Sequence, residues 1–109
     1  MQPDQNKLDE LVRRIVEAVH PLRIILFGSA ARGEMGPNSD LDVLVVMPDG
    51  THRRRTIGFL YERLYGFGFA KDIVVATETD IREHADNPGL IYRNVLREGR
   101  ELYRAETKT

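Results

Sequence analysis

Apolar residues occur along this chain in two patterns, helical spacing and short continuous runs, and their order predicts helices packed on a small sheet. Near the N-terminus they are spaced three or four positions apart between charged residues, at Leu8, Leu11, Val12, Ile15, Val16 and Val19. This spacing predicts an amphipathic helix with one apolar stripe. The helix is expected to end at His20-Pro21, because a residue that precedes proline is disfavoured in helical backbone conformation.

Short apolar runs predict the strands. Residues 23–27 are rich in branched and aromatic side chains, which is typical of a strand. Leu41 to Met47 is almost continuously apolar, which indicates a central strand covered on both faces. A third strand is expected over residues 70–76, and residues 100–103 could add a short strand at one edge.

Helical patterns fill the intervals between these strands. We expect a short helix over residues 29–34 with a turn at 36–39, a helix over 51–65, one from about residue 81, and one over 90–98. Asp80 with Glu83 resembles a capping box for the third of these helices. The predicted fold class is therefore α+β (mixed α/β), with a small mixed or antiparallel sheet of three to four strands and helices packed on it.

Composition narrows the class of protein. The 109 residues suffice for a single domain over 1–109, with a loose tail at 105–109, and 41% hydrophobic with 30% charged residues is typical of a globular chain. A net charge of −1 argues against strong nucleic-acid binding. Without cysteine there are no disulfides and no thiolate metal sites. We find no signal peptide and no membrane-spanning run, and expect a cytoplasmic protein.

Two aspartates carry the first chemical signal. Asp40 and Asp42 open the second strand, and residues two apart in a strand point to the same face. Carboxylates held close together repel each other and lose hydration, so a bound cation explains the pair, and Mg²⁺ suits such oxygen ligands. Asp72, near the start of the third strand, can join them, and three carboxylates could hold two metal ions. Taken alone, the pair fits a solvated polar strand entry equally well.

A phosphate-binding signal precedes these aspartates. Gly28-Ser29 follows the first strand, where glycine allows a ligand to approach the backbone and a helix N-terminus offers free N–H groups. Ser29 can donate its hydroxyl to a phosphate or simply cap the helix. Arg32 can bind phosphate or pair with a catalytic aspartate, and a structural salt bridge is an equally good interpretation.

The complete pattern resembles the polymerase-beta-type nucleotidyltransferase superfamily, and in particular its smallest branch, the minimal nucleotidyltransferases that act as antitoxins. The matching segments are residues 26–33 (LFGSAARG), 38–45 (NSDLDVLV), 71–75 (KDIVV) and 91–103. The resemblance implies a nucleotidyltransferase fold, with Asp40 and Asp42 as ligands of Mg²⁺. It also implies that Asp72 completes the metal site and helps to activate the acceptor hydroxyl, and that Gly28 and Ser29 hold the β- and γ-phosphates.

The resemblance further implies a reaction and a partner. The reaction would transfer AMP from ATP and release pyrophosphate, and the acceptor would be a tyrosine of a small helical toxin ribonuclease of the HEPN class. Two other hypotheses stay open: an antitoxin that acts by binding alone, and the catalytic subunit of a nucleotidyltransferase for a small molecule or an RNA. A homo- or hetero-oligomer is compatible with each of them.

Other side chains carry weaker signals. The basic run His52-Arg53-Arg54-Arg55 favours a solvated helix face over contact with an acidic partner or the triphosphate. Core packing is the favoured interpretation of four aromatic residues near the end of the helix over 51–65, with a partner-binding patch as the alternative; they are Tyr61, Tyr65, Phe67 and Phe69. The histidines lack the spacing of a metal site, and Lys71 is expected to point away from Asp72.

Overall fold

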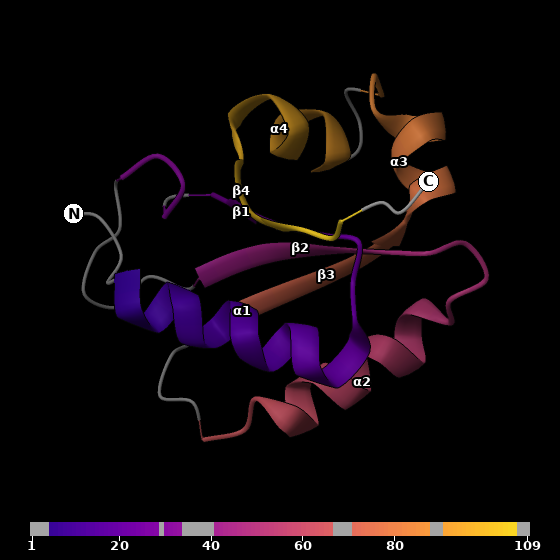
Figure 1. Ribbon diagram of the computed structural model, residues 1–109. Coiled ribbons are helices and arrows are strands. Elements are labelled where there is room, and N and C mark those ends of the chain that lie inside the picture. Colours follow the sequence, from indigo (N-terminus) through magenta and orange to yellow (C-terminus); the bar gives the residue numbers. More distant parts are fainter. Residues whose placement is uncertain (1–4, 29, 34–40, 67–70, 88–90, 107–109) are drawn as a thin grey trace.

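The computed structural model describes residues 5–28, 30–33, 41–66, 71–87 and 91–106. The described residues form four helices and four strands (Figure 1). In chain order these are α1 (Gln5–Val19), β1 (Arg23–Phe27), β2 (Leu41–Met47), α2 (Arg53–Arg63), β3 (Lys71–Thr77), α3 (Glu78–His84), α4 (Ile91–Glu98) and β4 (Arg100–Arg104). The four strands lie within one residue of their predicted positions.

The strands form one sheet in the order β3-β2-β1-β4. β1 runs antiparallel to both β2 and β4, whereas β2 and β3 are parallel and are connected through α2. The mixed sheet, the α+β class and the edge position of the last strand are thus confirmed. Because β1 is antiparallel to its neighbours, its C-terminal end lies beside the N-terminal end of β2.

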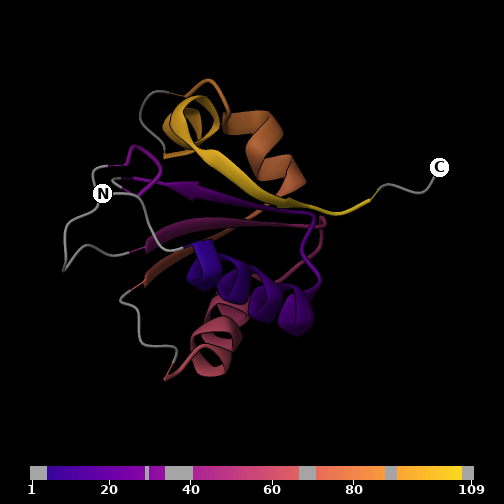
Figure 2. The same ribbon diagram turned by 60° about the vertical axis from the view of Figure 1, so that its left-hand side comes forward.

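Helices cover both faces of the sheet. α1 and α2 lie on one face, and α3 and α4 lie on the other (Figures 1 and 2). β2 contributes to both cores, because Val43 and Val45 pack towards α1 and α2 while Leu44 and Val46 pack on the opposite side. The predicted central position of β2 is therefore confirmed. In the part of the chain that the structure describes, no helix has the length and apolar content needed to cross a membrane.

The turn after β1 differs from the prediction. Instead of a helix over residues 29–34, the described part of this segment forms hydrogen-bonded turns, with Arg32 N donating to the Gly28 carbonyl at 3.3 Å and Gly33 N to the Ala30 carbonyl at 3.3 Å. Gly33 has φ 73°, a left-handed conformation that ends a right-handed turn. The predicted turn at 36–39 lies outside the described residues.

The capping box was assigned to the wrong residues. α3 begins at Glu78 rather than near Ile81, since Thr77 is its N-cap: the Thr77 hydroxyl accepts from Asp80 N at 3.2 Å, and the Asp80 carboxylate accepts from Thr77 N at 3.0 Å. Asp80 is thus the third helical residue and not the cap. Residues 77–80 are all polar and were assigned to neither element, although they form the end of β3 and the first turn of α3.

The expectation about two aromatic side chains was also wrong. Tyr61 and Tyr65 are not core residues, since they are 41% and 91% exposed, while Phe67 and Phe69 lie outside the described residues. At the C-terminus, Ala105, the first residue of the predicted loose tail, is held by a hydrogen bond from its N–H to the Leu22 carbonyl at 2.8 Å, while residues 107–109 lie outside the described part of the chain.

Candidate active site

Two of the predicted carboxylates lie side by side at one end of the sheet. Asp42 is the second residue of β2 and Asp72 is the second residue of β3, and the parallel register pairs these two positions directly. Paired positions on neighbouring strands are about 5 Å apart, and their side chains leave the same face of the sheet. That face is the one covered by α3 and α4, because Leu44, two residues after Asp42, packs in their core. Asp42 is partly buried and Asp72 is exposed.

Gly28 brings the end of β1 against this pair. Phe27, the last residue of β1, is the antiparallel partner of Asp42. Gly28 follows with φ 73°, and a Cβ atom at this position would collide with the Asp42 carboxylate oxygen Oδ2 and lie 3.4 Å from its Cγ. The glycine is therefore required for its backbone conformation and for the space that the carboxylate occupies.

Arg32 lies beside this glycine and contacts α4. Its guanidinium is 4.0 Å from the Glu98 carboxylate, and both side chains are about half exposed. A cavity of about 190 Å³ connects the turn to α4, lined by Phe27, Gly28, Arg32, Asn94, Val95 and Glu98. This volume is below the usual range of nucleotide-sized pockets and suits a smaller group such as a phosphate. An exposed ion pair at this distance contributes little stability, so it leaves Arg32 able to exchange Glu98 for an anionic ligand.

Asn94 and Glu98 were absent from the sequence-based set of site residues. Both belong to the polar side of an amphipathic helix, and nothing in the spacing of that helix indicates which part of the sheet it crosses. Ser29 and Asp40, in contrast, were predicted but lie outside the described residues. Their proposed roles therefore remain predictions.

The described carboxylates fit a divalent cation. Asp42 and Asp72 present oxygen ligands from two adjacent strands, and the missing Cβ of Gly28 leaves the Asp42 carboxylate room beside the backbone. Within the described ranges, no group of three acidic or histidine side chains is placed to hold a metal ion. A site with three carboxylates therefore requires Asp40, the remaining member of the predicted set.

Comparison with known proteins identifies the family. Residues 7–102 match the model of the nucleotidyltransferase domain family. This chain belongs to that family. A protein of Methanocaldococcus jannaschii, named as a putative protein adenylyltransferase, is 35% identical over 81 residues, which cover 74% of this chain and 77% of the relative. The chain is thus a nucleotidyltransferase, as its resemblance implied.

Solved structures agree with this nucleotidyltransferase in fold. A putative nucleotidyltransferase from Sulfolobus solfataricus superimposes with a TM-score of 0.62 at 18% identity, covering 91% of this chain and 78% of the other. A toxin-antitoxin structure with AMP-PNP superimposes with a TM-score of 0.51 at 22% identity, covering 95% of this chain and 76% of the other. At these identities the likeness establishes the fold.

The basic run of the nucleotidyltransferase lies away from its carboxylates. His52 caps α2 by accepting from Arg55 N at 3.1 Å, and Arg53 binds Asp80 at 3.0 Å. The run follows the C-terminal end of β2, whereas Asp42 lies near its N-terminal end. Arg54 and Arg55 are exposed, which agrees with the favoured interpretation of a solvated helix face.

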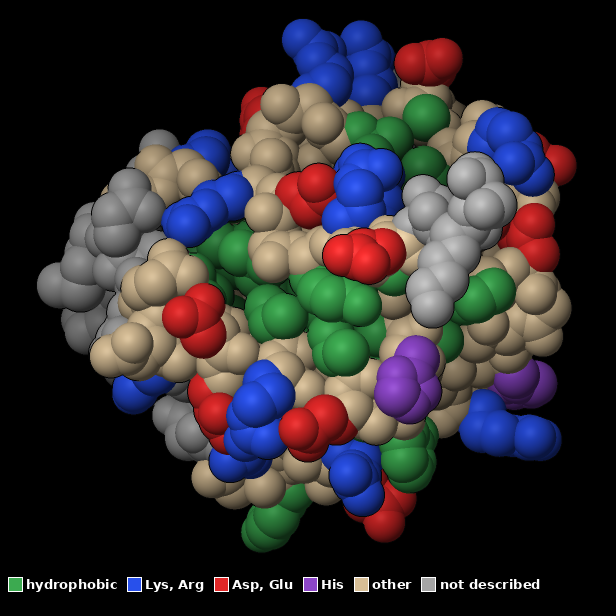
Figure 3. All heavy atoms as spheres, viewed as in Figure 1, with side chains coloured by type: hydrophobic (Ala, Val, Ile, Leu, Met, Phe, Trp, Pro, Cys, Tyr) green, Lys and Arg blue, Asp and Glu red, His purple; other side chains and the backbone are tan. Residues whose placement is uncertain are grey.

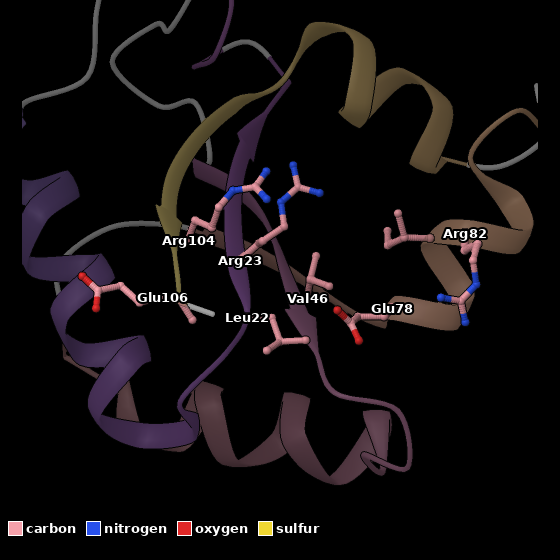
Figure 4. A pocket seen from close by; sticks show the side chains of 9 residues that line it. Leu22, Arg23, Val46, Glu78, Arg82, Arg104 and Glu106 are labelled. Atoms are coloured by element: carbon pink, nitrogen blue, oxygen red, sulfur yellow. The ribbon is translucent and has the colours of Figure 1, made fainter. Parts of the chain in front are cut away.

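Another cavity lies at this far end of the sheet. It has a volume of about 330 Å³, and Figure 4 shows Arg23 and Arg104 projecting beside each other from its wall. Both arginines bind Glu101, at 2.8 Å and 3.1 Å, and Glu78 and Glu106 also line the cavity. These acidic groups balance the arginines. Figure 3 likewise shows acidic and basic side chains interspersed over the face seen in Figure 1.

Proposed function

We propose that this nucleotidyltransferase transfers AMP from ATP to a hydroxyl group of a partner protein. The observation that carries the proposal is the direct pairing of Asp42 with Asp72, with Gly28 placed against the Asp42 carboxylate. Support also comes from the relative named as a putative protein adenylyltransferase, and from the structural neighbour that was solved with AMP-PNP.

Asp40, Asp42 and Asp72 would hold Mg²⁺, with room for two ions if all three carboxylates face one another. Magnesium would supply neutralisation of the negative charge on the triphosphate and on the leaving pyrophosphate. Gly28 and Ser29 would bind the β- and γ-phosphates through backbone N–H groups and the serine hydroxyl. Arg32 would contribute a phosphate contact from the same turn.

The transfer itself is a simple exchange of bonds. The acceptor hydroxyl oxygen forms a bond to the α-phosphorus of ATP, the bond from that phosphorus to the bridging oxygen breaks, and pyrophosphate leaves. Asp72 would accept the hydroxyl proton, since it is the exposed member of the described pair. Most of the rate enhancement would then come from positioning and charge neutralisation, which a small domain can provide.

For the acceptor, we propose a tyrosine of a small helical toxin ribonuclease of the HEPN class, with this chain as the antitoxin that adenylylates it in the cytoplasm. The toxin-antitoxin structure with the same fold supports a partner of this kind. The two proteins would form a hetero-oligomer, and the partner would supply the acceptor side chain.

The experiment incubates the protein with ATP labelled at the α-phosphate, Mg²⁺ and the product of the neighbouring gene, which the proposal expects to be the HEPN-class toxin. We expect label to enter a tyrosine of that protein. Asp42→Asn should reduce labelling by at least about a hundredfold, because loss of one ligand or charge-stabilising group commonly costs that much. Asp86→Asn, which alters an exposed carboxylate following α3, is the matched control and should label as wild type does.

Three outcomes would contradict the proposal. If the partner is not labelled but Asp42→Asn still protects cells from the toxin, neutralisation occurs by binding alone. If label enters an aminoglycoside or a tRNA and no protein, the acceptor class is wrong. If Asp42→Asn labels as fast as wild type, the carboxylate site is wrong.

A further inference from the structure

A tyrosine on α2 forms a hydrogen bond next to one of the proposed catalytic carboxylates. The Tyr61 hydroxyl oxygen accepts a hydrogen bond from the backbone N–H of Ile73 at 3.1 Å. Ile73 directly follows Asp72 in β3. The bond therefore holds, from α2, the backbone next to Asp72, whose carboxylate is proposed to bind the metal and the proton.

β3 needs such support because it lies at the edge of the sheet. It pairs with β2 on one side only, so backbone groups directed to the other side lack a strand partner. Strand ends at a sheet edge open more readily than central strands. Asp72 is the second residue of this strand, where an opening would separate it from Asp42.

Apolar packing between α2 and β3 does not fix this position along the strand. Leu60 and Leu64 are fully buried in the core that also contains Ile73. Contacts of this kind are not directional and permit small shifts of an edge strand. The bond to Tyr61 is directional, and it joins α2 to β3 in the described part of the chain.

The exposure of the ring also separates this tyrosine from an ordinary core residue. Tyr61 remains 41% exposed although its hydroxyl reaches the backbone of β3. Tyr65, one turn further along, is 91% exposed. Tyr65 is thus a more exposed tyrosine close to Tyr61 in the chain, and it serves as the control for substitutions of Tyr61.

We propose that Tyr61 is a positioning residue, whose hydroxyl holds the start of β3 so that the Asp72 carboxylate stays beside that of Asp42. This inference rests on the role proposed above for Asp72. Tyr61 does not touch the reacting atoms, and its effect passes through the Ile73 amide.

The first test measures backbone opening without any reaction. Tyr61→Phe keeps the ring and removes the hydrogen-bond acceptor. We expect the Ile73 amide to exchange its hydrogen about two to ten times faster in this variant, which corresponds to the loss of one net hydrogen bond. Tyr65→Phe is the matched control and should leave exchange at Ile73 unchanged, and the Leu44 amide in the central strand should be unaffected in both variants.

The second test measures metal binding and transfer. We expect Tyr61→Phe to weaken the binding of Mn²⁺, followed by broadening of the amide signals of residues 41–43 and 72–74, by about two- to tenfold. With labelled ATP, Mg²⁺ and the HEPN-class protein, kcat should fall by about two- to tenfold while KM for ATP stays within about twofold. In an Asp72→Glu background the loss should be smaller, because both substitutions act on the same carboxylate.

The outcomes separate this inference from the proposed function. Unchanged hydrogen exchange at Ile73 in Tyr61→Phe overturns the positioning role of Tyr61. Faster exchange with an unchanged kcat in an active enzyme also overturns that role, but it leaves the proposed function intact. If wild type transfers no nucleotide, the proposed function fails. Mn²⁺ binding then decides whether Tyr61 positions Asp72, and equal affinity in wild type and Tyr61→Phe overturns that role.

Discussion

Gly28 meets two requirements at one position, and these can be separated by experiment. Its φ of 73° disfavours a side chain, and the Asp42 carboxylate occupies the space that a Cβ atom would need. Gly66 has a similar φ of 81°, but a Cβ there would meet nothing within 4 Å. The pair therefore distinguishes backbone strain from the crowding of a carboxylate.

We expect Gly66→Ala to lower the free energy of unfolding by about 1–2 kcal/mol, the usual cost of a left-handed conformation for alanine. Gly28→Ala should cost about 1–3 kcal/mol more, because the new methyl group also displaces Asp42. Urea unfolding of both variants and wild type measures the difference. Equal losses would show that the carboxylate moves aside freely.

Asp80 is a residue whose ionisation contributes to folding. The backbone N–H of Thr77 holds the pKa of its carboxyl below the usual 3.8, and the Thr77 hydroxyl and Arg53 act in the same direction. Since the folded state binds the proton less readily than the unfolded state, this stabilisation is complete above about pH 4 and disappears as the pH falls through the lowered pKa.

Asp80→Asn is therefore expected to lower the free energy of unfolding at pH 7 by about 0.5–1.5 kcal/mol, since the amide keeps a hydrogen-bond acceptor but loses the charge. The deficit should shrink when the pH falls from 4 to 2. Urea unfolding over this pH range tests both statements, with Asp86→Asn as the exposed control. A deficit that is equal at pH 2 and pH 7 would contradict the charge argument.

At the scale of elements, a glycine fixes how α4 meets the sheet. A Cβ at Gly99 would collide with the Val95 carbonyl oxygen, lie 2.6 Å from Ile25 Cγ2 and lie 3.1 Å from the Leu26 carbonyl oxygen. The end of α4 thus rests directly on the backbone of β1. Because Val95 and Glu98 line the cavity beside Gly28, this contact also positions one wall of the site.

Gly99→Ala should therefore lower the free energy of unfolding by about 1–3 kcal/mol through overpacking. Gly58, inside α2, is the matched control: a Cβ there would meet nothing within 4 Å, and Gly58→Ala should raise stability by about 0.5–1 kcal/mol through helix propensity. Thermal unfolding of the two variants would show opposite shifts. A neutral Gly99→Ala would mean that α4 can lift from β1.

Periodicity predicted the elements better than their ends. The alternation of apolar runs was sufficient for the four strands, because each run is short and is bounded by polar or turn residues. It failed at Thr77, where β3 passes directly into α3, and at residues 30–33, where two left-handed glycines enclose turns. It also assigned Tyr61 to the core, since spacing cannot reveal that a hydroxyl reaches a backbone amide.

The site was predicted as a set of residue types, and its arrangement depends on topology. Asp42 and Asp72 are 30 positions apart in the sequence, and only the parallel pairing of β2 with β3 makes them neighbours. The antiparallel pairing of β1 with β2 then brings Gly28, which follows β1, beside Asp42. The contribution of α4 through Asn94 and Glu98 could not be predicted, because it depends on where the helix crosses the sheet.

At the scale of the whole molecule, ligand binding should stabilise the fold. A ligand that binds only the folded state raises the free energy of unfolding by about 2.7 kcal/mol at a hundred times its Kd. We expect AMP-PNP with Mg²⁺ to raise Tm, and EDTA to remove most of that increase. Asp42→Asn should show little shift with either addition. An equal shift for wild type and Asp42→Asn would place the nucleotide away from the carboxylates.

The strand order has a consequence for the growing chain. β1, β2 and β3 are complete by Thr77, and the chain up to that residue already includes Gly28, Asp42 and Asp72, whereas β4, which pairs with β1, comes only at Arg100–Arg104. During synthesis the carboxylate end of the sheet can therefore assemble while β1 still has an open edge. Closing that edge must wait until residues 100–104 leave the ribosome. Until then, β1 is a second open edge besides β3, to which another nascent chain could pair.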